Sequence, residues 1–145
     1  MAVTVKKIIL WRAEVDNRPG ALSTALEPLA QAGVDLRVVM GYRHQGAEGK
    51  AAIEVFPISG KRAATAGSAA GLAVAEIPAL LVEGDNKPGL GYRIAQAIAA
   101  AGINMAFFMA HVIGRKFAAV IGFETEDDAK KAMPAIKSAG RGAKA

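Results

Sequence analysis

The sequence predicts an α+β fold made of two tandem copies of one β–α–β–β–α–β unit, and a repeated motif is the first reason. Residues 14–20 read Glu-Val-Asp-Asn-Arg-Pro-Gly, and residues 83–89 read Glu-Gly-Asp-Asn-Lys-Pro-Gly. A second block, Gly-Val-Asp-Leu at 33–36, recurs as Gly-Ile-Asn-Met at 102–105, with the same offset of 69 residues. Two separate blocks with one offset indicate an internal duplication. We therefore expect a first repeat over residues 1–77, a second over 78–136, and a basic flexible tail over 137–145.

Hydrophobic periodicity predicts the first two elements of each repeat. Apolar residues alternate with polar ones from Ile9 to Val15, which is the period of a half-buried strand, and Ala79 to Glu83 is the matching strand. The Asn-basic-Pro-Gly turn suits the start of a helix, because proline fits the first helical turn. The buried stripes expected for these helices are Leu22, Leu26 and Leu29 in the first repeat and Leu90, Ile94 and Ile98 in the second. Gly33 and Gly102 are expected to end the two helices.

Two more strands and a helix follow in each repeat. Alternate residues predicted to face the helices are Val34, Leu36, Val38, Met40 and Tyr42 in the first repeat, and Ile103, Met105, Phe107 and Met109 in the second. The third strands are expected over 51–56 and 117–123. The second helices are expected to start near Ser59 and at Thr125, where an acidic residue three positions later is typical of a capping box. Residues 72–77 are the expected fourth strand of the first repeat, and no fourth strand is visible in the second.

This order is the ferredoxin-like α+β plan, with the helices on one face of antiparallel sheets. The opposite face of the second repeat would carry Ala106, Phe108, Ala110 and Val112. An apolar sheet face without helices favours burial against another sheet or subunit.

Composition argues against several functions. The chain has no cysteine, which excludes disulfide scaffolds and thiolate chemistry. Neither His44 nor His111 lies in a catalytic or metal-ligand spacing, and no glycine-rich phosphate loop occurs, so we expect no catalysis, no metal and no cofactor. The apolar run before Arg12 is too short to predict a signal peptide, and glycine and polar residues interrupt the uncharged run between Arg93 and Arg115. We therefore expect a cytoplasmic protein without a membrane span.

The basic charge is a weak argument for nucleic acid. The formal net charge is +5 and the isoelectric point is about 9.7, but residues 137–145 hold Lys137, Arg141 and Lys144 and no acidic residue. The closest match to an RNA-binding strand, residues 115–123, has Ala119 and Gly122 where stacking aromatics are needed. An RNA-binding ferredoxin-like domain is therefore the least favoured hypothesis.

The repeated loop is the candidate functional site. A helix N-terminus offers unpaired N–H groups and partial positive charge, which favour a carboxylate or a phosphate. Asn17 and Asn86 each add an amide donor and acceptor, and Asn104, at the start of the next strand, is expected to lie close to the same loop. Together these groups match the carboxylate and ammonium of a free amino acid. The alternative is that each asparagine only hydrogen-bonds its own turn.

The two loops and the strand starts that follow them resemble the ACT domain, a small regulatory module that binds amino acids. The loop is particularly similar to that of the serine-sensing regulatory domain of 3-phosphoglycerate dehydrogenase. The residues that the resemblance assigns to ligand binding are Asn17, Pro19, Gly20, Ala21, Leu22 and Asp35 in the first repeat, and Asn86, Pro88, Gly89, Leu90 and Asn104 in the second. Asp35 stands where that family has asparagine, and Val15 and Gly84 stand where it has histidine, so the second repeat carries the fuller set.

The resemblance implies a sensor or regulatory protein that binds a small amino acid or related effector at the interface between its two repeats. It also implies a homodimer and a regulated enzyme as possible partners. Further candidates to line the sites are Asp16, Arg18, Arg37, Asp85 and Arg93. The alternative hypothesis is a protein-interaction or oligomerisation module without a ligand, which would use the apolar sheet face as its interface.

Overall fold

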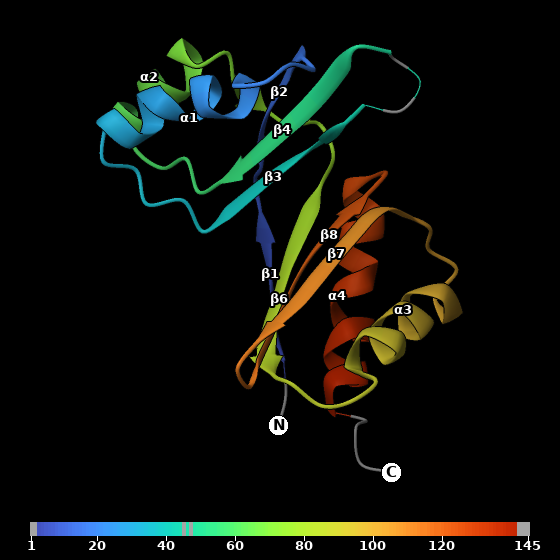
Figure 1. Ribbon diagram of the computed structural model, residues 1–145. Helices are drawn as coiled ribbons and strands as arrows, with labels where there is room; N and C mark the ends of the chain where they lie inside the picture. Colours follow the sequence, from blue (N-terminus) through green and yellow to red (C-terminus); the bar gives the residue numbers. More distant parts are fainter. Residues whose placement is uncertain (1–2, 45, 47, 142–145) are drawn as a thin grey trace. The chain divides into compact units, whose positions relative to one another are not determined.

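The computed structural model describes residues 3–44, 46 and 48–141, and the chain forms two compact α+β units. One unit comprises Ile9–Glu76 and is called the inserted unit. The other comprises Met1–Ile8 together with Ile77–Ala145 and is called the split unit. Each unit has a four-stranded antiparallel sheet with two helices on one of its faces (Figure 1). The predicted fold class is confirmed.

The inserted unit follows the predicted order of elements. These are β2 (Trp11–Asp16), α1 (Ala21–Gln31), β3 (Val38–Arg43), β4 (Lys50–Phe56), α2 (Lys61–Ala69) and β5 (Ala73–Val74), in a sheet of order β3-β4-β2-β5. Leu29 of α1 packs on Ala13, Ile53 and Val55 of the sheet. The fourth strand is shorter than the predicted 72–77, although the Ala75 N–H still donates to the Leu10 carbonyl at 2.8 Å.

The split unit has the same strand order, and one of its strands comes from the start of the chain. Its elements are β6 (Ala79–Asp85), α3 (Leu90–Ala100), β7 (Met105–Ile113), β8 (Lys116–Phe123), α4 (Glu126–Arg141) and β1 (Thr4–Ile8), in a sheet of order β1-β6-β8-β7. The predicted stripe of α3 is confirmed, because Leu90, Ile94 and Ile98 are all buried in the core.

Strand β1 corrects the predicted assignment of residues 1–8 to the first repeat. It pairs antiparallel with β6, from Thr4 opposite Glu83 to Ile8 opposite Ala79. Val5 contributes to the same core as the helices α3 and α4. The second sheet is therefore not missing its fourth strand. An edge strand can be paired by any segment that the topology brings to it, and local periodicity does not identify that segment.

Helix α4 corrects the expectation of a flexible tail over 137–145. The helix continues to Arg141, because the buried positions Ala132, Ile136 and Gly140 extend one apolar stripe at a spacing of four residues. Gly140 lies so close to β1 that a Cβ there would be 2.7 Å from Val3 Cγ2. Residues 142–145 of the predicted tail lie outside the described residues. The predicted start of the helix is confirmed, since Thr125 Oγ1 accepts a hydrogen bond from the Asp128 N–H at 3.0 Å.

The side chains of β7 face the opposite sides of the sheet from those predicted. A register irregularity lies between Met105, opposite Phe123, and Phe107, opposite Gly122. A bulge of this kind adds one residue and reverses which side chains face the core. Phe108 consequently packs against the core of the split unit, and Phe107 lies over Gly122, where any side chain would clash with its ring. The helix-free face therefore carries Phe107 rather than Phe108.

The same reversal occurs before β3. Val34 and Leu36 pack against the core of the inserted unit as predicted. Within β3, however, it is Gly41 that faces helix α1, with the Leu22 methyl groups 3.8 and 3.9 Å from the position of a Cβ. Met40 and Tyr42 therefore lie on the helix-free face, opposite to the prediction. Leu22 itself is 41% exposed rather than buried.

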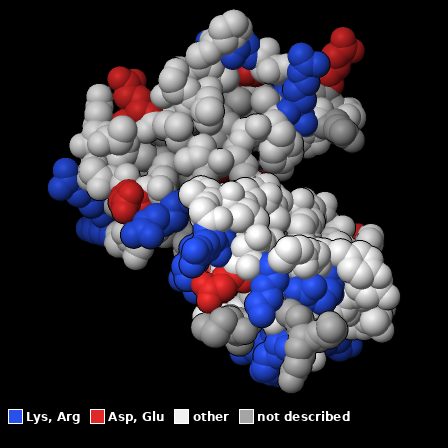
Figure 2. Space-filling view, turned by 60° about the horizontal axis from the view of Figure 1, so that its bottom comes forward, with Lys and Arg blue, Asp and Glu red and all other residues white. Residues whose placement is uncertain are grey.

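The uncharged run between Arg93 and Arg115 is divided between α3 and β7. Within the described residues, no helix is both long and apolar enough to cross a membrane. On the face shown in Figure 2, basic side chains lie beside uncharged and acidic ones, and several of them gather around one acidic group.

Candidate functional site

The repeated loop has the same backbone geometry in both units. The Asn17 N–H donates to the Gly49 carbonyl at 2.8 Å, and the Asn86 N–H donates to the Arg115 carbonyl at 2.8 Å. Directly before each helix, Gly20 has φ of 85° and Gly89 has φ of 83°. Glycine adopts this left-handed conformation without the strain that a side chain would add. The loop is therefore fixed between a neighbouring hairpin and a helix N-terminus.

The repeated aspartates have a structural role that sequence analysis did not predict. Asp16 accepts a hydrogen bond from Lys50 Nζ at 2.8 Å, and Asp85 accepts one from Lys116 Nζ at 2.6 Å. In each case the hydrogen bond and the positive charge of the lysine hold the pKa of the aspartate below its ordinary value of 3.8. Each aspartate thus joins the end of the first strand of its unit to the hairpin beside it.

The asparagine side chains are available for a ligand. Asn17 and Asn86 are exposed, and within the part of the chain that the structure describes their amide groups make no hydrogen bond. Pro19 and Gly20 in one loop, and Pro88 and Gly89 in the other, are exposed as well. The hydrogen bonds and glycine conformations described above account for the backbone of these turns. The exposed asparagine side-chain amides take no part in those hydrogen bonds.

The strand starts do not lie near the loop of their own unit. Asn104 precedes Met105, which pairs with Phe123 at the end of the sheet where β6 begins, and Asn86 follows β6 at its other end. Seven strand residues, at about 3.3 Å each, separate the two ends by roughly 20 Å. Asp35 lies at the corresponding end of the inserted unit and accepts a hydrogen bond from Arg37 Nε at 3.2 Å. The expected approach of Asn104 to the loop of its own unit is therefore wrong.

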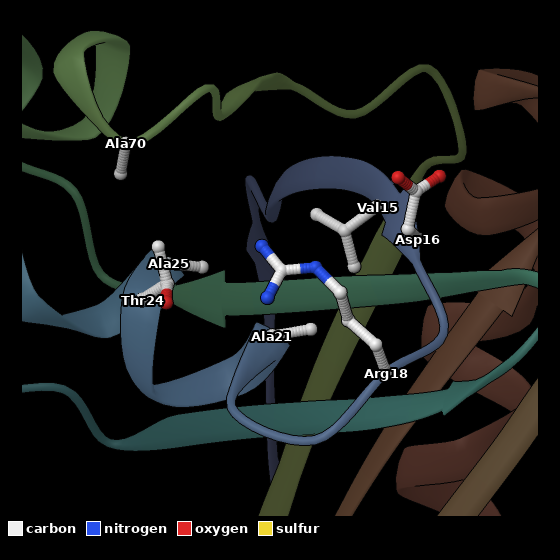
Figure 3. A pocket seen from close by; sticks show the side chains of 7 residues that line it. All are labelled: Val15, Asp16, Arg18, Ala21, Thr24, Ala25 and Ala70. Atoms are coloured by element: carbon white, nitrogen blue, oxygen red, sulfur yellow. The ribbon is translucent and has the colours of Figure 1, made fainter.

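A cavity of about 110 Å³ adjoins the loop of the inserted unit. Its lining combines the end of β2, the loop, the first turns of α1 and the residue that follows α2, namely Val15, Asp16, Arg18, Ala21, Thr24, Ala25 and Ala70 (Figure 3). Figure 3 shows the Arg18 guanidinium over the start of α1, directed toward Thr24 and Ala25. Sequence analysis predicted Asp16, Arg18 and Ala21 as site residues and missed Thr24, Ala25 and Ala70. The run of small residues along α1 was a signal that could have indicated open space.

The chemistry of this cavity favours a small anion with an apolar part. Arg18 supplies a cation and makes no ion pair within the described residues. In the first turn of α1, the Ala21 N–H donates to the Arg18 carbonyl at 3.2 Å and the Thr24 N–H donates to the Gly20 carbonyl at 2.9 Å. The N–H groups of Leu22 and Ser23 therefore remain to attract a carboxylate. Alanine methyl groups form an apolar wall beside the Thr24 hydroxyl.

A second hollow lies on the helix-free face of the inserted unit and is occupied by a polar network. Arg12, Tyr42, Arg43 and His44 line it. The Tyr42 hydroxyl donates to Glu54 Oε1 at 2.9 Å, and burial together with this carboxylate raises the pKa of Tyr42 above 10.0. His44 Nε2 lies 3.3 Å from Glu14 Oε2. Tyr42 and His44 thus already have carboxylate partners, whereas Arg18 makes no ion pair within the described residues, so we take the cavity beside the loop as the better candidate site.

Comparison with solved structures supports the fold. A Bacteroides thetaiotaomicron protein matches over 90% of this chain and 88% of its own, with a TM-score of 0.73 and 15% identity. The regulatory subunit of aspartate kinase from Thermus thermophilus matches over 96% of this chain and 97% of its own, with a TM-score of 0.65 and 16% identity. The corresponding subunit from Thermus flavus covers the same shares, with a TM-score of 0.57 and 17% identity.

The two units have the same order of elements and the same loop, and these matches cover nearly the whole chain. The chain has a tandem ACT fold. No protein-family model matches the chain, and no curated protein matches its sequence. In this tandem ACT fold, the duplicated loop lies at the N-terminus of the first helix of each unit, so one chain presents two copies of the loop.

Proposed function

We propose that this protein is a regulatory sensor that binds a small free amino acid at the repeated loop. The observation that best supports this proposal is the cavity beside Arg18, where a cation and a helix N-terminus adjoin an apolar wall. A carboxylate is stabilised by the cation and the helix N–H groups, and a short side chain is stabilised by the alanine methyl groups. Such a combination suits an α-amino acid better than a purely apolar or a purely anionic ligand.

Regulation rather than catalysis is supported by the structural neighbours. Two of them are regulatory subunits of aspartate kinase. By analogy, the partner of this chain is an enzyme whose activity depends on whether the loop site is occupied, and the protein acts as a cytoplasmic homodimer. A ligand shifts such an equilibrium only by its difference in affinity between the two states. The location of the site between the two repeats stays a prediction.

A thermal-denaturation screen of the twenty amino acids tests the proposed function. An amino acid that binds the folded protein raises its free energy of unfolding by about 2.7 kcal/mol at one hundred times the dissociation constant. We expect at least one amino acid to raise the melting temperature. Arg18→Gln should weaken that binding by about 1–3 kcal/mol, because a charged partner of the carboxylate is lost.

The matched control is Arg62→Gln, which removes the same charge from an exposed position on α2 outside the cavity. It should leave the ligand-induced shift unchanged. If none of the twenty amino acids changes the melting temperature, the sensor hypothesis is wrong. The ligand-free interaction module would then be the better hypothesis.

A further inference from the structure

Building on the proposed function, we infer that the two loops of the chain are not equivalent. The loop of the inserted unit binds the amino acid, and the loop of the split unit is closed by its own side chains. The ligand is an amino acid with a short side chain. One chain would therefore bind one ligand molecule, although its sequence contains the motif twice.

The first observation is a change of size at matched positions of the two helices. With the offset of 69 residues, the cavity residues Ala21 and Ala25 correspond to Leu90 and Ile94. Leu90 is 3% exposed and Ile94 is 0% exposed, and both belong to the core of the split unit. The volume that is open beside α1 is therefore taken up by larger side chains beside α3.

The second observation is the position of Arg93, which corresponds to Thr24. Its Nη1 donates to the Pro88 carbonyl at 3.3 Å and lies 3.4 Å from the position of a Cβ on Gly89. The guanidinium thus folds back over the loop of its own unit. Its Nε and Nη2 atoms are buried and lack a hydrogen-bond partner. A ligand cannot reach these buried donors unless the arginine side chain moves away.

The size of the cavity limits the ligand. A cavity of about 150 Å³ admits benzene, which has six heavy atoms. The cavity of the inserted unit has about 110 Å³ and is partly open to solvent, so only the part of a ligand that lies between the loop and the helices must be smaller than benzene. With the carboxylate held at Arg18, this space suits a side chain of the size found in alanine or serine. An aromatic side chain is too large unless the helices separate.

Isothermal titration calorimetry of the 145-residue chain with glycine, L-alanine, L-serine and L-phenylalanine tests the inference. We expect at least one of the three small amino acids to bind with a stoichiometry of one per chain, and no binding of L-phenylalanine. Two exchange variants locate the site. Thr24→Arg introduces the side chain of the closed loop and should weaken binding by about tenfold or more. Arg93→Thr introduces the side chain of the open loop and should leave the affinity of the inserted unit unchanged.

The outcomes separate the inference from the proposed function. Two molecules bound per wild-type chain, or loss of binding in Arg93→Thr but not in Thr24→Arg, would overturn the inference and leave the sensor function intact. Preferred binding of L-phenylalanine would overturn the size limit. Absence of binding by all three small amino acids would overturn the inference, and the absence of a thermal shift with any of the twenty amino acids would overturn the proposed function as well. Both exchanged residues lie in the first turns of helices and outside the buried cores, and the melting temperature of each variant verifies its folding.

Discussion

At the scale of single residues, the repeated motif combines structural and ligand-binding roles. Asp16 and Asp85 are bonded to lysines of the neighbouring hairpins, and Gly20 and Gly89 provide the left-handed turn before each helix. These residues are explained by the local fold alone. The exposed Asn17 amide and Arg18 of the inserted unit are not, which makes them the better candidates for contact with a ligand.

The aspartate–lysine pairs predict a specific pH dependence. Because the pKa values of Asp16 and Asp85 lie below 3.8 in the folded state, their contribution to stability is present above pH 3.8 and is lost as the pH falls through the folded-state values. Carboxyl-carbon NMR should show both aspartates titrating below 3.8. Lys50→Met should raise the pKa of Asp16 and leave that of Asp85 unchanged, and Lys116→Met should do the reverse. A wild-type Asp16 that titrates at its ordinary value would contradict the ion pair.

At the scale of elements, sequence periodicity predicted the helices well and the strand faces poorly. The stripe of α3 is buried as expected, because three apolar residues at helical spacing define one face. The faces of β3 and β7 were reversed by irregularities ahead of Val38 and at Ala106. Since strand side chains alternate with a period of two, one extra residue exchanges the faces of everything that follows. No residue in the sequence marks such a position.

Strand β1 provides the second prediction at this scale. Val5 is buried in the core of the split unit, and Thr4 is exposed beside it. Val5→Ala should lower the free energy of unfolding by about 2 kcal/mol, because a buried side chain is truncated. Thr4→Ala should lower it by about 1 kcal/mol or less, because the exposed Thr4 loses only the hydrogen bond from its hydroxyl to the Glu83 carbonyl at 3.3 Å. Urea denaturation measures both variants. Equal, small effects would contradict the pairing of β1 with β6.

At the scale of the whole molecule, the duplication was predictable and the difference between its copies was not. Two blocks with one offset revealed the repeat and its loops. Whether a loop is open, however, depends on side chains one and two helical turns away, such as Ala25 in one unit and Ile94 in the other. Motif residues alone favoured the second repeat as the more complete site. The cavity lies in the first repeat instead, because the packing of the helix side chains determines whether a ligand fits beside the loop.

The most direct test of the account is a map of the site by NMR. Amide spectra of the isotope-labelled chain would be recorded during titration with glycine, L-alanine and L-serine. The account predicts that the amide signals of residues 16–25, including Arg18 and Thr24, shift with saturable dependence on at least one of these amino acids, while those of residues 85–94 stay largely unchanged. Shifts centred on residues 85–94, or no saturable shift with any of the three, would contradict it.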